Sequence, residues 1–350
     1  MIGAEEASST GSFGAAGSLS EARYYHAATL LADGRVLVIG GIGPDGRLTS
    51  AEAWDPATSS FSPAGNLADA RSDHTASPLP DGRVLVVGGQ GLELNLTTAE
   101  LWDPGTSSFT PGGELAEGRA FHTATNLPDG RVLVVGGQDT GGSSLASGEL
   151  WDPAVGMFGS TGSMATGRYA HTATLLPDGR VLVTGGDGPG GGPFATAEVW
   201  DPVTGTFSAA GSMTTRRLSH TASPLPDGRV LIAGGVGGAE GQDFDSMAPL
   251  RTAEIWDGRS GMFESTGSMA ADLTEHTASV LPDGRILMVG YQPNADLWDP
   301  ATAAFSPTGA PTDPRYNHTA TTLADGRVLV VGGGGATPDA PLATAEMWGD

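Results

Sequence analysis

The chain contains no cysteine and no lysine. Without cysteine, disulfides, zinc–thiolate sites and cysteine nucleophiles are excluded. The 17 basic residues are therefore all arginine, and with 40 acidic residues they give a formal net charge of -23. This excess of negative charge disfavours binding to nucleic acid phosphates and to anionic lipid, so we expect neutral or cationic partners.

Long apolar runs are also absent. The opening "MIGAEEASSTGSFG" lacks a basic segment followed by an apolar one, and no stretch approaches the roughly 20 apolar residues of a membrane helix. We therefore expect neither a signal peptide nor a membrane-spanning segment. The compartment stays open, because a mature secreted form and a cytoplasmic protein both fit, with secretion slightly favoured.

What the chain does contain is a repeat. The segment "HTATLLPDGRVLVTGG" occurs in seven near copies. Every histidine of the chain falls in one slot of the repeat, and every tryptophan falls in another. The copies start at His26, His74, His122, His171, His220, His276 and His318. One such histidine or Gly-Gly pair alone would suggest a ligand or a phosphate loop, but seven indicate a structural unit.

Each unit predicts four β-strands. In the fourth unit they are residues 171–176, 180–186, 196–202 and 205–211, and no helical pattern is present. Asp-Gly between the first two strands indicates a hairpin, and we expect positive φ at both turn residues. These strands are apolar on both faces, as expected when each sheet packs between two others in a propeller.

The two ends of the chain predict how the ring closes. The seventh unit stops at "TAEMWGD", one strand short, and the chain begins with an unpaired fourth strand, "GSFGAAGSL". We predict that residues 12–19 complete the last blade of an all-β, closed seven-bladed propeller with four antiparallel strands per blade. Residues 1–350 then form one domain, with residues 1–10 as a flexible tail.

The Arg-x-x-His start, the Gly-Gly pair and a period near ~50 residues resemble the kelch repeat. Tryptophan on the third strand and phenylalanine on the fourth, as at Trp200 and Phe207, look more like the bacterial, galactose-oxidase-like branch. A WD-repeat interpretation fits less well, because no copy has glycine before the histidine. The resemblance implies a binding surface on the loops, or a copper oxidase, epimerase or lyase-like activity. Galactose-oxidase chemistry is disfavoured, because its cofactor is a tyrosine cross-linked to cysteine.

Repeat positions predict the bonds between strands. Zinc needs four ligands at ~2.0–2.1 Å, and histidines spread around a ring cannot converge on one ion that closely. We therefore expect the repeat histidines to be buried and hydrogen-bonded, and we expect no metal or other cofactor. Two repeat positions are candidates for a buried ion pair. One is the arginine three residues before the histidine, and the other is the glutamate two residues before the tryptophan. The sixth unit has Leu273 and Asp296 instead, which fits a paired loss and equally fits ordinary drift.

Only the segment between Gly-Gly and the Ala-Glu position varies in length, with 9, 9, 10, 10, 17, 3 and 11 residues in the seven units. These segments and the starts of the first strands lie at the same end of the blades, which we call the loop face. The residues before each histidine vary and, with one residue of the sixth unit, include every tyrosine. Candidate ligand-binding residues are Tyr24, Tyr25, Asp73, Phe121, Tyr169, Glu275, Tyr291, Gln292, Tyr316 and Asn317. Packing against neighbouring loops is the alternative role.

The sixth unit breaks the repeat most often. We hypothesise a notch walled by residues 236–252 and floored by Tyr291, Gln292 and Glu275, with simple degeneration of the blade as the alternative. The predicted function is a non-catalytic, monomeric binding module that takes a glycan or a protein segment at the loop face. The alternatives are a sugar-active, epimerase- or oxidase-related enzyme using Asp73 and Glu275, and an engineered scaffold with no ligand.

Overall fold

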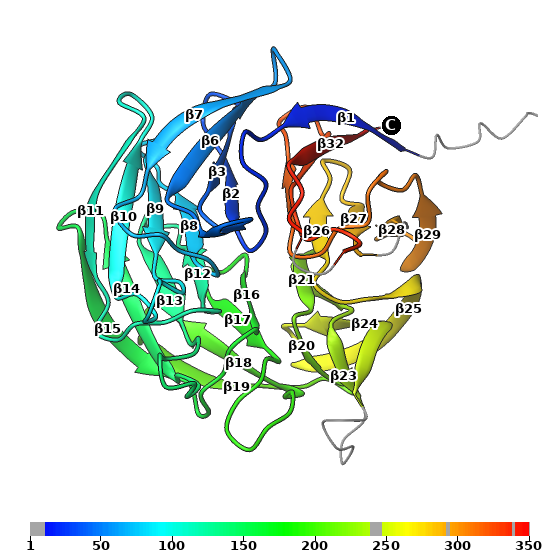
Figure 1. Cartoon of the computed structure of the whole chain (residues 1–350). Coiled ribbons are helices and arrows are strands. Elements are labelled where there is room, and N and C mark those ends of the chain that lie inside the picture. Colours follow the sequence, from blue (N-terminus) through cyan, green and yellow to red (C-terminus); the bar gives the residue numbers. More distant parts are fainter. Residues whose placement is uncertain (1–10, 239–246, 292–294, 338–339, 350) are drawn as a thin grey trace, which may run out of the picture.

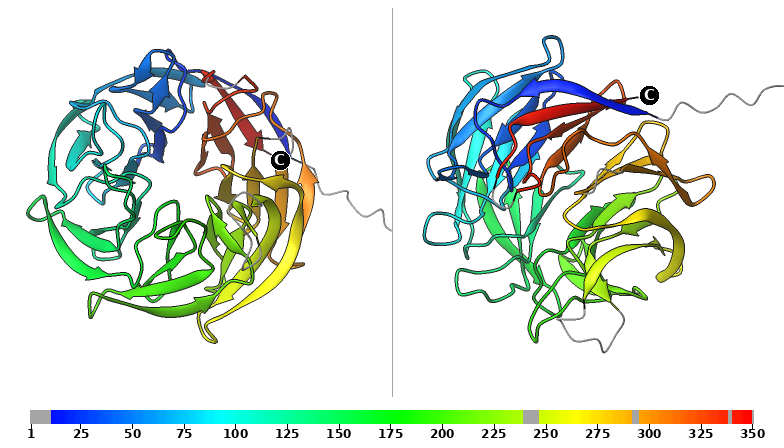
Figure 2. Two further views of the ribbon diagram at one scale, coloured as in Figure 1. Left: turned by 60° about the horizontal axis from the view of Figure 1, so that its bottom comes forward. Right: turned by 45° about the vertical axis from the view of Figure 1, so that its right-hand side comes forward.

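The computed structural model describes residues 11–238, 247–291, 295–337 and 340–349. These residues form seven antiparallel sheets arranged in a ring, as Figures 1 and 2 show. None of them forms a helix, so the described part of the chain holds no membrane-spanning helix. The prediction of an all-β, seven-bladed propeller is confirmed.

The blades follow one another along the chain, with their strands in order from the axis outward. Blade 1 contains β2 (Ala27–Leu30), β3 (Val36–Ile39), β6 (Ser50–Asp55) and β7 (Ser60–Asn66). Blade 2 contains β8 (Thr75–Pro78), β9 (Val84–Val87), β10 (Thr98–Asp103) and β11 (Ser108–Glu114). Blade 3 contains β12 (Thr123–Asn126), β13 (Val132–Val135), β14 (Ser147–Asp152) and β15 (Met157–Ser163). Blade 4 contains β16 (Thr172–Leu175), β17 (Val181–Thr184), β18 (Thr196–Asp201) and β19 (Thr206–Ser212).

The remaining blades include the longest strands and the closing strand. Blade 5 contains β21 (Thr221–Pro224), β22 (Val230–Ala233), β24 (Ala248–Asp257) and β25 (Met262–Leu273), extended by β20 (Arg216–Leu218) and β23 (Val236–Gly238). Blade 6 contains β26 (Thr277–Val280), β27 (Ile286–Val289), β28 (Ala295–Asp299) and β29 (Ala304–Thr308). Blade 7 contains β30 (Thr319–Thr322), β31 (Val328–Val331), β32 (Thr344–Gly349) and β1 (Ser12–Ser18). A small hairpin of β4 (Ile42–Gly43) and β5 (Gly46–Arg47) stands on blade 1.

The closing strand lies where the termini predict it. Strand β1 pairs antiparallel with β32, with Phe13 opposite Trp348, and the two strands run side by side in Figure 1. The outer edge of β32 is thereby paired, so the last blade has the same four strands as the others. The predicted flexible tail, residues 1–10, lies outside the described residues.

The Asp-Gly hairpins differ from the expectation in their turn geometry. In blade 1, Gly34 N–H donates to the Leu31 carbonyl, and Leu31 N–H donates to the Arg35 carbonyl, which defines a three-residue loop. Gly34 has φ 88°, but Asp33 has no positive φ. The expectation of positive φ at both turn residues is therefore wrong. The aspartate instead accepts a hydrogen bond from Arg35 N–H at 3.1 Å, which fits a turn that ends in a left-handed glycine.

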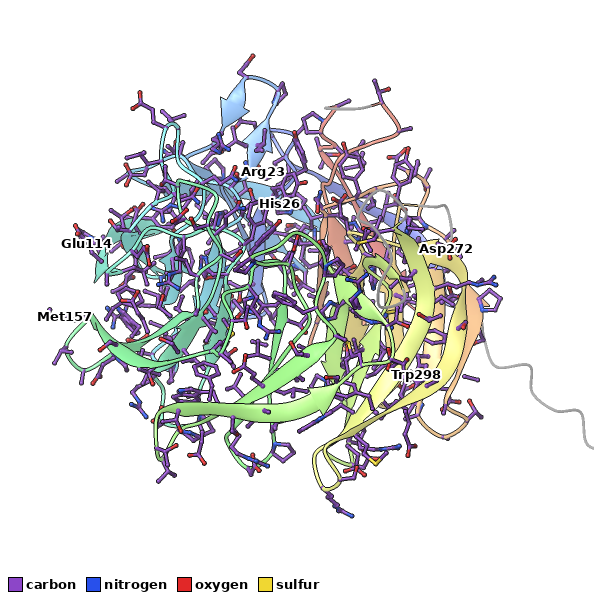
Figure 3. All side chains as sticks on the ribbon, turned by 90° about the horizontal axis from the view of Figure 1, so that it is seen from below. Arg23, His26, Glu114, Met157, Asp272 and Trp298 are labelled. Carbon is purple, nitrogen blue, oxygen red and sulfur yellow. The ribbon has the colours of Figure 1, made fainter. Side chains whose placement is uncertain are left out.

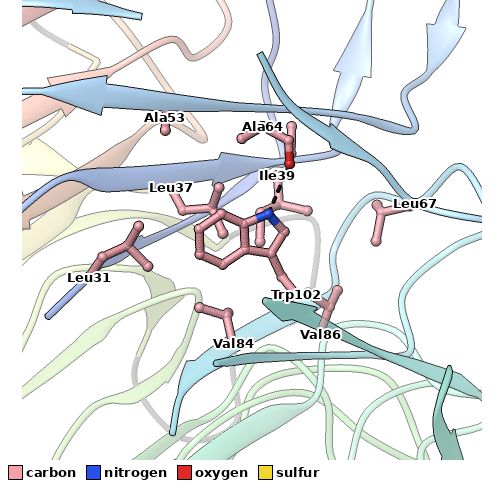
Figure 4. Packing of buried hydrophobic residues seen from close by; sticks show 10 residues of the cluster. Leu31, Leu37, Ile39, Ala53, Ala64, Leu67, Val84, Val86 and Trp102 are labelled. Carbon is pink, nitrogen blue, oxygen red and sulfur yellow. Dashed lines mark hydrogen bonds between the residues drawn. The ribbon is translucent and has the colours of Figure 1, made fainter. Parts of the chain in front are cut away.

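The hydrophobic core is divided into seven clusters, one at each contact between neighbouring blades. Figure 4 shows the cluster between blades 1 and 2, where Leu37 and Ile39 of β3 face Val84, Val86 and Trp102. Alternate residues of one strand thus pack against opposite neighbours, which explains why the second strand of each unit is apolar throughout. Trp102 is fully buried, and its indole N–H donates to the Ala64 carbonyl of the preceding blade at 2.9 Å.

The predicted buried ion pair is present in six blades. Its N–O distances range from 2.7 to 3.2 Å, in Arg23–Glu52, Arg71–Glu100, Arg119–Glu149, Arg168–Glu198, Arg217–Glu254 and Arg315–Glu346. In blade 2, the second oxygen of the glutamate accepts Ala68 N–H at 2.9 Å, from the segment that arrives from blade 1. The pair therefore joins the start of each blade to the end of the preceding one.

The repeat histidines also bond between blades, as predicted. Six of them hold the threonine hydroxyl of the preceding blade through Nε2 at 2.9–3.1 Å: His26, His122, His171, His220, His276 and His318. His74 has no such partner, because blade 1 has Ala27 in the threonine slot. Burial lowers the pKa of all seven histidines, so the rings are neutral at physiological pH.

The junction between blades 5 and 6 lacks bonds found at the other junctions. Leu273 and Asp296 replace the ion pair, and the buried Oδ1 of Asp296 has no hydrogen-bond partner. The indole N–H of Trp298 is also unpartnered, whereas the other six tryptophans donate to the preceding blade. Burial raises the pKa of Asp296, and the hydrogen bond from Ala270 N–H offsets part of that rise.

Candidate functional site

The residue before each repeat histidine adopts a left-handed backbone conformation. The seven φ values lie between 49° and 55°, at Tyr25, Asp73, Phe121, Ala170, Ser219, Glu275 and Asn317. Ten non-glycine residues in the described chain have positive φ, and the remaining three lie in the turns before the fourth strand. Positive φ is costly for most of these residue types, so the surrounding structure must hold each of them in place.

Hydrogen bonds around the axis hold these seven residues, which we call the axial ring. Six of the seven ring N–H groups donate to the ring carbonyl of the preceding blade, for example Asp73 N–H to the Tyr25 carbonyl at 3.2 Å. Six such links are present, and the described residues show none between Ser219 and Glu275. The axial ring is therefore a nearly closed circle of backbone bonds, interrupted at the junction of blades 5 and 6.

The axial ring surrounds a cavity of about 400 Å³, which we call the axial cavity. Its lining combines the whole axial ring with Tyr169, Leu218 and five repeat histidines. The size is in the range of small-ligand pockets. In Figure 3, the labelled Arg23 and His26, which start blade 1, lie toward the middle of the molecule, whereas Met157 of the outer strand β15 lies at its edge.

Asp73 is the most strongly perturbed carboxylate of the axial cavity. Its burial raises its pKa to about 6; a hydrogen bond from Ser72 and the positive charge of Arg47 oppose the rise, and the charge of Glu275 adds to it. Ser72 Oγ donates to Asp73 Oδ2 at 2.8 Å and accepts from Arg47 Nε at 3.2 Å. Arg47, from the β4–β5 hairpin, therefore orients Asp73 through Ser72.

Glu275 is the second carboxylate of the axial cavity. Burial raises its pKa, and interaction with the Asn317 side chain partly offsets the rise. Burial also raises the pKa of Tyr25, helped by the charges of Glu275 and Asp73. The two carboxylates lie on blades 2 and 6, but both act on Tyr25, so they belong to one electrostatic site. Carboxylates and a phenol with shifted pKa values in one cavity are typical of functional sites.

Aromatic rings gather on two sides of this cavity. On one side Tyr25, Tyr24, Tyr316 and Tyr291 form a row, with successive ring centroids 5.0, 6.2 and 5.8 Å apart. On the other side the rings of Phe121 and Tyr169 are 6.3 Å apart. These spacings are those of interacting aromatic pairs. All five tyrosines thus lie in the two groups, although only Tyr25 and Tyr169 line the cavity itself.

The predicted site residues divide according to their position in the repeat. Six of the ten line the axial cavity: Tyr25, Asp73, Phe121, Tyr169, Glu275 and Asn317. Tyr24, Tyr316 and Tyr291 lie beside it in the aromatic row. Gln292 lies outside the described residues, as do residues 239–246 of the long loop that would wall the predicted notch. The notch stays a prediction, and the contact that the structure does give Tyr291 is with Tyr316.

Other lining residues were absent from the predicted set. Ala170 and Ser219 occupy the same slot as Asp73, so the slot itself was the signal that would have found them. Arg47, which acts on Asp73 through Ser72, could not be found this way, because it belongs to a loop of irregular sequence. Phe194, another aromatic residue of the loop face, packs over the buried Arg168 guanidinium at 5.2 Å and does not line the cavity.

A second hollow, of about 450 Å³, lies between blades 4 and 5 on the face opposite the loops. Gly258 occurs there in place of the proline that follows Trp-Asp in five other units. Its charged walls include Asp178 and Asp227, which pair with arginines of their own turns. Because the same pair occurs in the turn of every blade, these charges do not distinguish the hollow as a ligand site. The axial cavity is therefore the candidate site.

The ring of sheets and the cavity at its axis define the class of protein as a seven-bladed β-propeller with an axial site. The family model for the Kelch motif matches residues 23–68 and 168–214. With seven copies of the repeat and seven blades, the chain is a kelch-repeat β-propeller, as its sequence predicts. Kelch propellers generally serve as binding or interaction modules, and the fold supports such a role here.

A solved structure gives the same fold. It is titled as a novel fungal alcohol oxidase of the AA5 family in complex with copper, and it matches with a TM-score of 0.75 and 22% sequence identity. The match covers 97% of this chain and 76% of the oxidase chain, and at this identity it shows the fold alone. A comparison with curated proteins gives no match.

The described residues of this chain do not fit a bound copper ion such as the one in the oxidase complex. Among the described residues, no three histidine, aspartate or glutamate side chains come together as a ligand set. The histidines that line the axial cavity use Nε2 to hold a threonine of the preceding blade. No step of the proposed function therefore involves a metal.

Proposed function

We propose that this kelch propeller is a non-catalytic binding module that holds a glycan or a protein segment in the axial cavity of its loop face. The observation that carries the proposal is the axial ring, seven strained residues that place Tyr25, Asp73, Phe121, Glu275 and Asn317 around one cavity. Strained backbone maintained by several hydrogen bonds is typical of sites that bind ligands. Rigid aromatic rings supply contact area at a low entropic cost.

The charge of the chain supports the choice of partner. A net charge of -23 opposes nucleic acid and anionic membranes, so a glycan or a protein segment is the better ligand class. We propose that the protein acts as a monomer, because one ring carries the whole cavity.

The test is a binding titration of the full chain against panels of oligosaccharides and short peptides, followed by tyrosine and tryptophan fluorescence and by calorimetry. Phe121→Asn removes a cavity ring, and asparagine tolerates the φ of 55° at this position. We expect at least about a tenfold loss of affinity, since removal of an aromatic residue at the centre of a binding site costs about 2 kcal/mol or more.

Ser107→Asn is the matched control, because Ser107 also has positive φ, at 49°, but lies in a turn of the opposite face. We expect this variant to bind like the wild type. If no member of either panel binds, or if both variants bind like the wild type, the axial cavity is not the binding site.

A sugar-active enzyme on the same face is the second candidate. The observation in its favour is that Asp73 and Glu275 line one cavity and both have raised pKa values. Under this alternative, Asp73→Asn or Glu275→Gln abolishes turnover of a bound sugar while leaving its affinity unchanged. Affinity without turnover in the wild type supports the binding module instead.

A further inference from the structure

The charges that line the axial cavity are of one sign. Asp73 and Glu275 are the only carboxylates of its described lining, which contains no arginine. The five lining histidines are buried and have lowered pKa values, so they add no positive charge at physiological pH. Arg47 is the nearest cation that acts on Asp73, and Ser72 separates it from that carboxylate. The cavity is therefore anionic at neutral pH.

The neutral groups of the lining suit a cation as well. Tyr25, Phe121 and Tyr169 line the cavity, and the face of an aromatic ring attracts cations; Asn317 supplies an amide beside Glu275. A buried carboxylate gains most from a partner that donates hydrogen bonds and carries positive charge. An anionic ligand is repelled by both carboxylates, and a neutral sugar leaves their charge uncompensated.

On the basis of the proposed binding function, we propose that the axial cavity takes the ammonium or guanidinium group of a basic side chain in a protein segment. The carboxylates come from blades 2 and 6, so they approach the cation from different parts of the ring. A single long side chain with a charged end fits a cavity of about 400 Å³ better than a folded surface does. The row of tyrosines beside the cavity offers contact area for the neighbouring residues of the same segment.

The affinity for such a cation should depend on pH. The groups that act on Asp73 are Ser72 of its own blade, Arg47 and Tyr25 of blade 1, and Glu275 of blade 6. The pKa of Asp73 is about 6 in the free protein, and a cation prefers the ionised carboxylate. Affinity is therefore full above this pKa and falls as the pH is lowered through it.

The experiment is calorimetric titration of the full chain at pH 7.5 and about 0.15 M salt, where the long-range attraction of the acidic surface is screened. The probes are acetyl-Gly-Lys-Gly-amide, its arginine counterpart, and the lysine peptide acetylated on Nζ. We expect acetylation to weaken binding at least about tenfold, because it removes the charge. We expect n-butylammonium, which carries the lysine side-chain cation without the peptide, to bind more weakly than the lysine peptide.

Two substitutions in blade 2 separate the cavity from the general surface charge. Asp73→Asn should weaken binding of the lysine peptide at least about tenfold at pH 7.5 and reduce the loss of affinity between pH 7.5 and 5, because Glu275 is then the only carboxylate of the described lining. Asp81→Asn changes the net charge equally, but Asp81 lies in an exposed turn of the opposite face, so it should leave affinity unchanged. Circular dichroism spectra and melting curves of both variants establish that they fold.

The outcomes distinguish this inference from the function on which it rests. If the acetylated and free lysine peptides bind equally well, or if only neutral oligosaccharides bind, the proposal of a cationic ligand is wrong. The proposed binding function is unaffected by either result. If n-butylammonium binds as tightly as the peptide, the peptide backbone adds nothing to the affinity. The proposal that the cation belongs to a protein segment is then wrong. If no peptide or oligosaccharide binds, both proposals fail. Loss of affinity with Asp81→Asn as large as with Asp73→Asn shows that surface charge alone attracts the peptide.

Discussion

Ala27 removes one hydrogen bond from a series of otherwise equivalent bonds between blades. In the repeat, a threonine hydroxyl of one blade meets the Nε2 of the next histidine, but Ala27 leaves the buried His74 without this partner. We predict that Ala27→Thr raises the free energy of unfolding by about 1 kcal/mol, the usual net value of one hydrogen bond. Urea denaturation followed by tryptophan fluorescence measures the change.

Thr75→Ala is the matched control for this prediction, because it creates at His122 the arrangement that His74 has naturally. It should lower the free energy of unfolding by about the same amount or somewhat more, since it leaves a buried ring nitrogen unpaired. If Ala27→Thr is neutral while Thr75→Ala is destabilising, His74 is satisfied by another group and the prediction is wrong.

The sequence predicts some of these residues better than others. The ion pairs follow from the repeat, because the blade without the arginine is also the blade without the glutamate. The axial ring does not follow, because its members include Tyr25, Phe121 and Ala170, which have no preference for positive φ. The two residues before each histidine are therefore equivalent in sequence. Only the structure shows that the second one lines the cavity in every blade, joined by the first one only at Tyr169 and Leu218.

At the scale of strands and blades, the junction between blades 5 and 6 is the weakest in its polar bonds. We predict that Leu273→Arg combined with Asp296→Glu restores the pair seen in Arg217–Glu254. The double variant should be more stable than the sum of the two single variants by about 1 kcal/mol or more, since residues in contact couple to this extent. A double-mutant cycle of urea denaturation curves measures the coupling, and additive effects would contradict it.

Asp296→Asn tests the same junction through pH. Burial raises the pKa of Asp296 in the folded state, so ionisation of this carboxylate costs folding stability above the ordinary aspartate pKa of about 4. The asparagine variant should therefore gain stability relative to the wild type at pH 7 and show little difference at pH 3, where the carboxylate is protonated in both states. A difference that does not change with pH would contradict the assignment.

Strand order and strand faces are predictable from the sequence because every blade repeats the same apolar pattern, as in β9 and β13. The turn type is not, because Asp-Gly suits both a two-residue turn and a three-residue loop with a left-handed glycine. The extension of blade 5 by β20 and β23 is also unpredictable. It depends on β23, which lies in a long loop whose residues match no other unit and pairs with both β20 and β24.

At the scale of the whole molecule, a single strand closes the ring. Strand β1 pairs with β32, Trp54 donates to the Ala16 carbonyl, and Ala16 and Leu19 pack against Val36 and Val38 of blade 1. Separating β1 from β32 thus exposes two junctions at once. The axial ring depends on this closure, because Tyr25 of the first blade donates to the Asn317 carbonyl of the last.

A disulfide across this closure tests its contribution to stability. Gly14 and Met347 lie opposite each other in the register of β1 and β32, and a side chain added at Gly14 meets open space. The chain has no cysteine, so Gly14→Cys with Met347→Cys introduces a single possible disulfide. We predict that the oxidised double variant is more stable than its reduced form by about 2–4 kcal/mol, because the bond links the two ends of the unfolded chain. Thermal melts with and without reductant measure the gain, and the single variants, which should not respond to reductant, are the controls. A bond that forms without raising the Tm would show that unfolding begins elsewhere, with the junction of blades 5 and 6 as the first place to look.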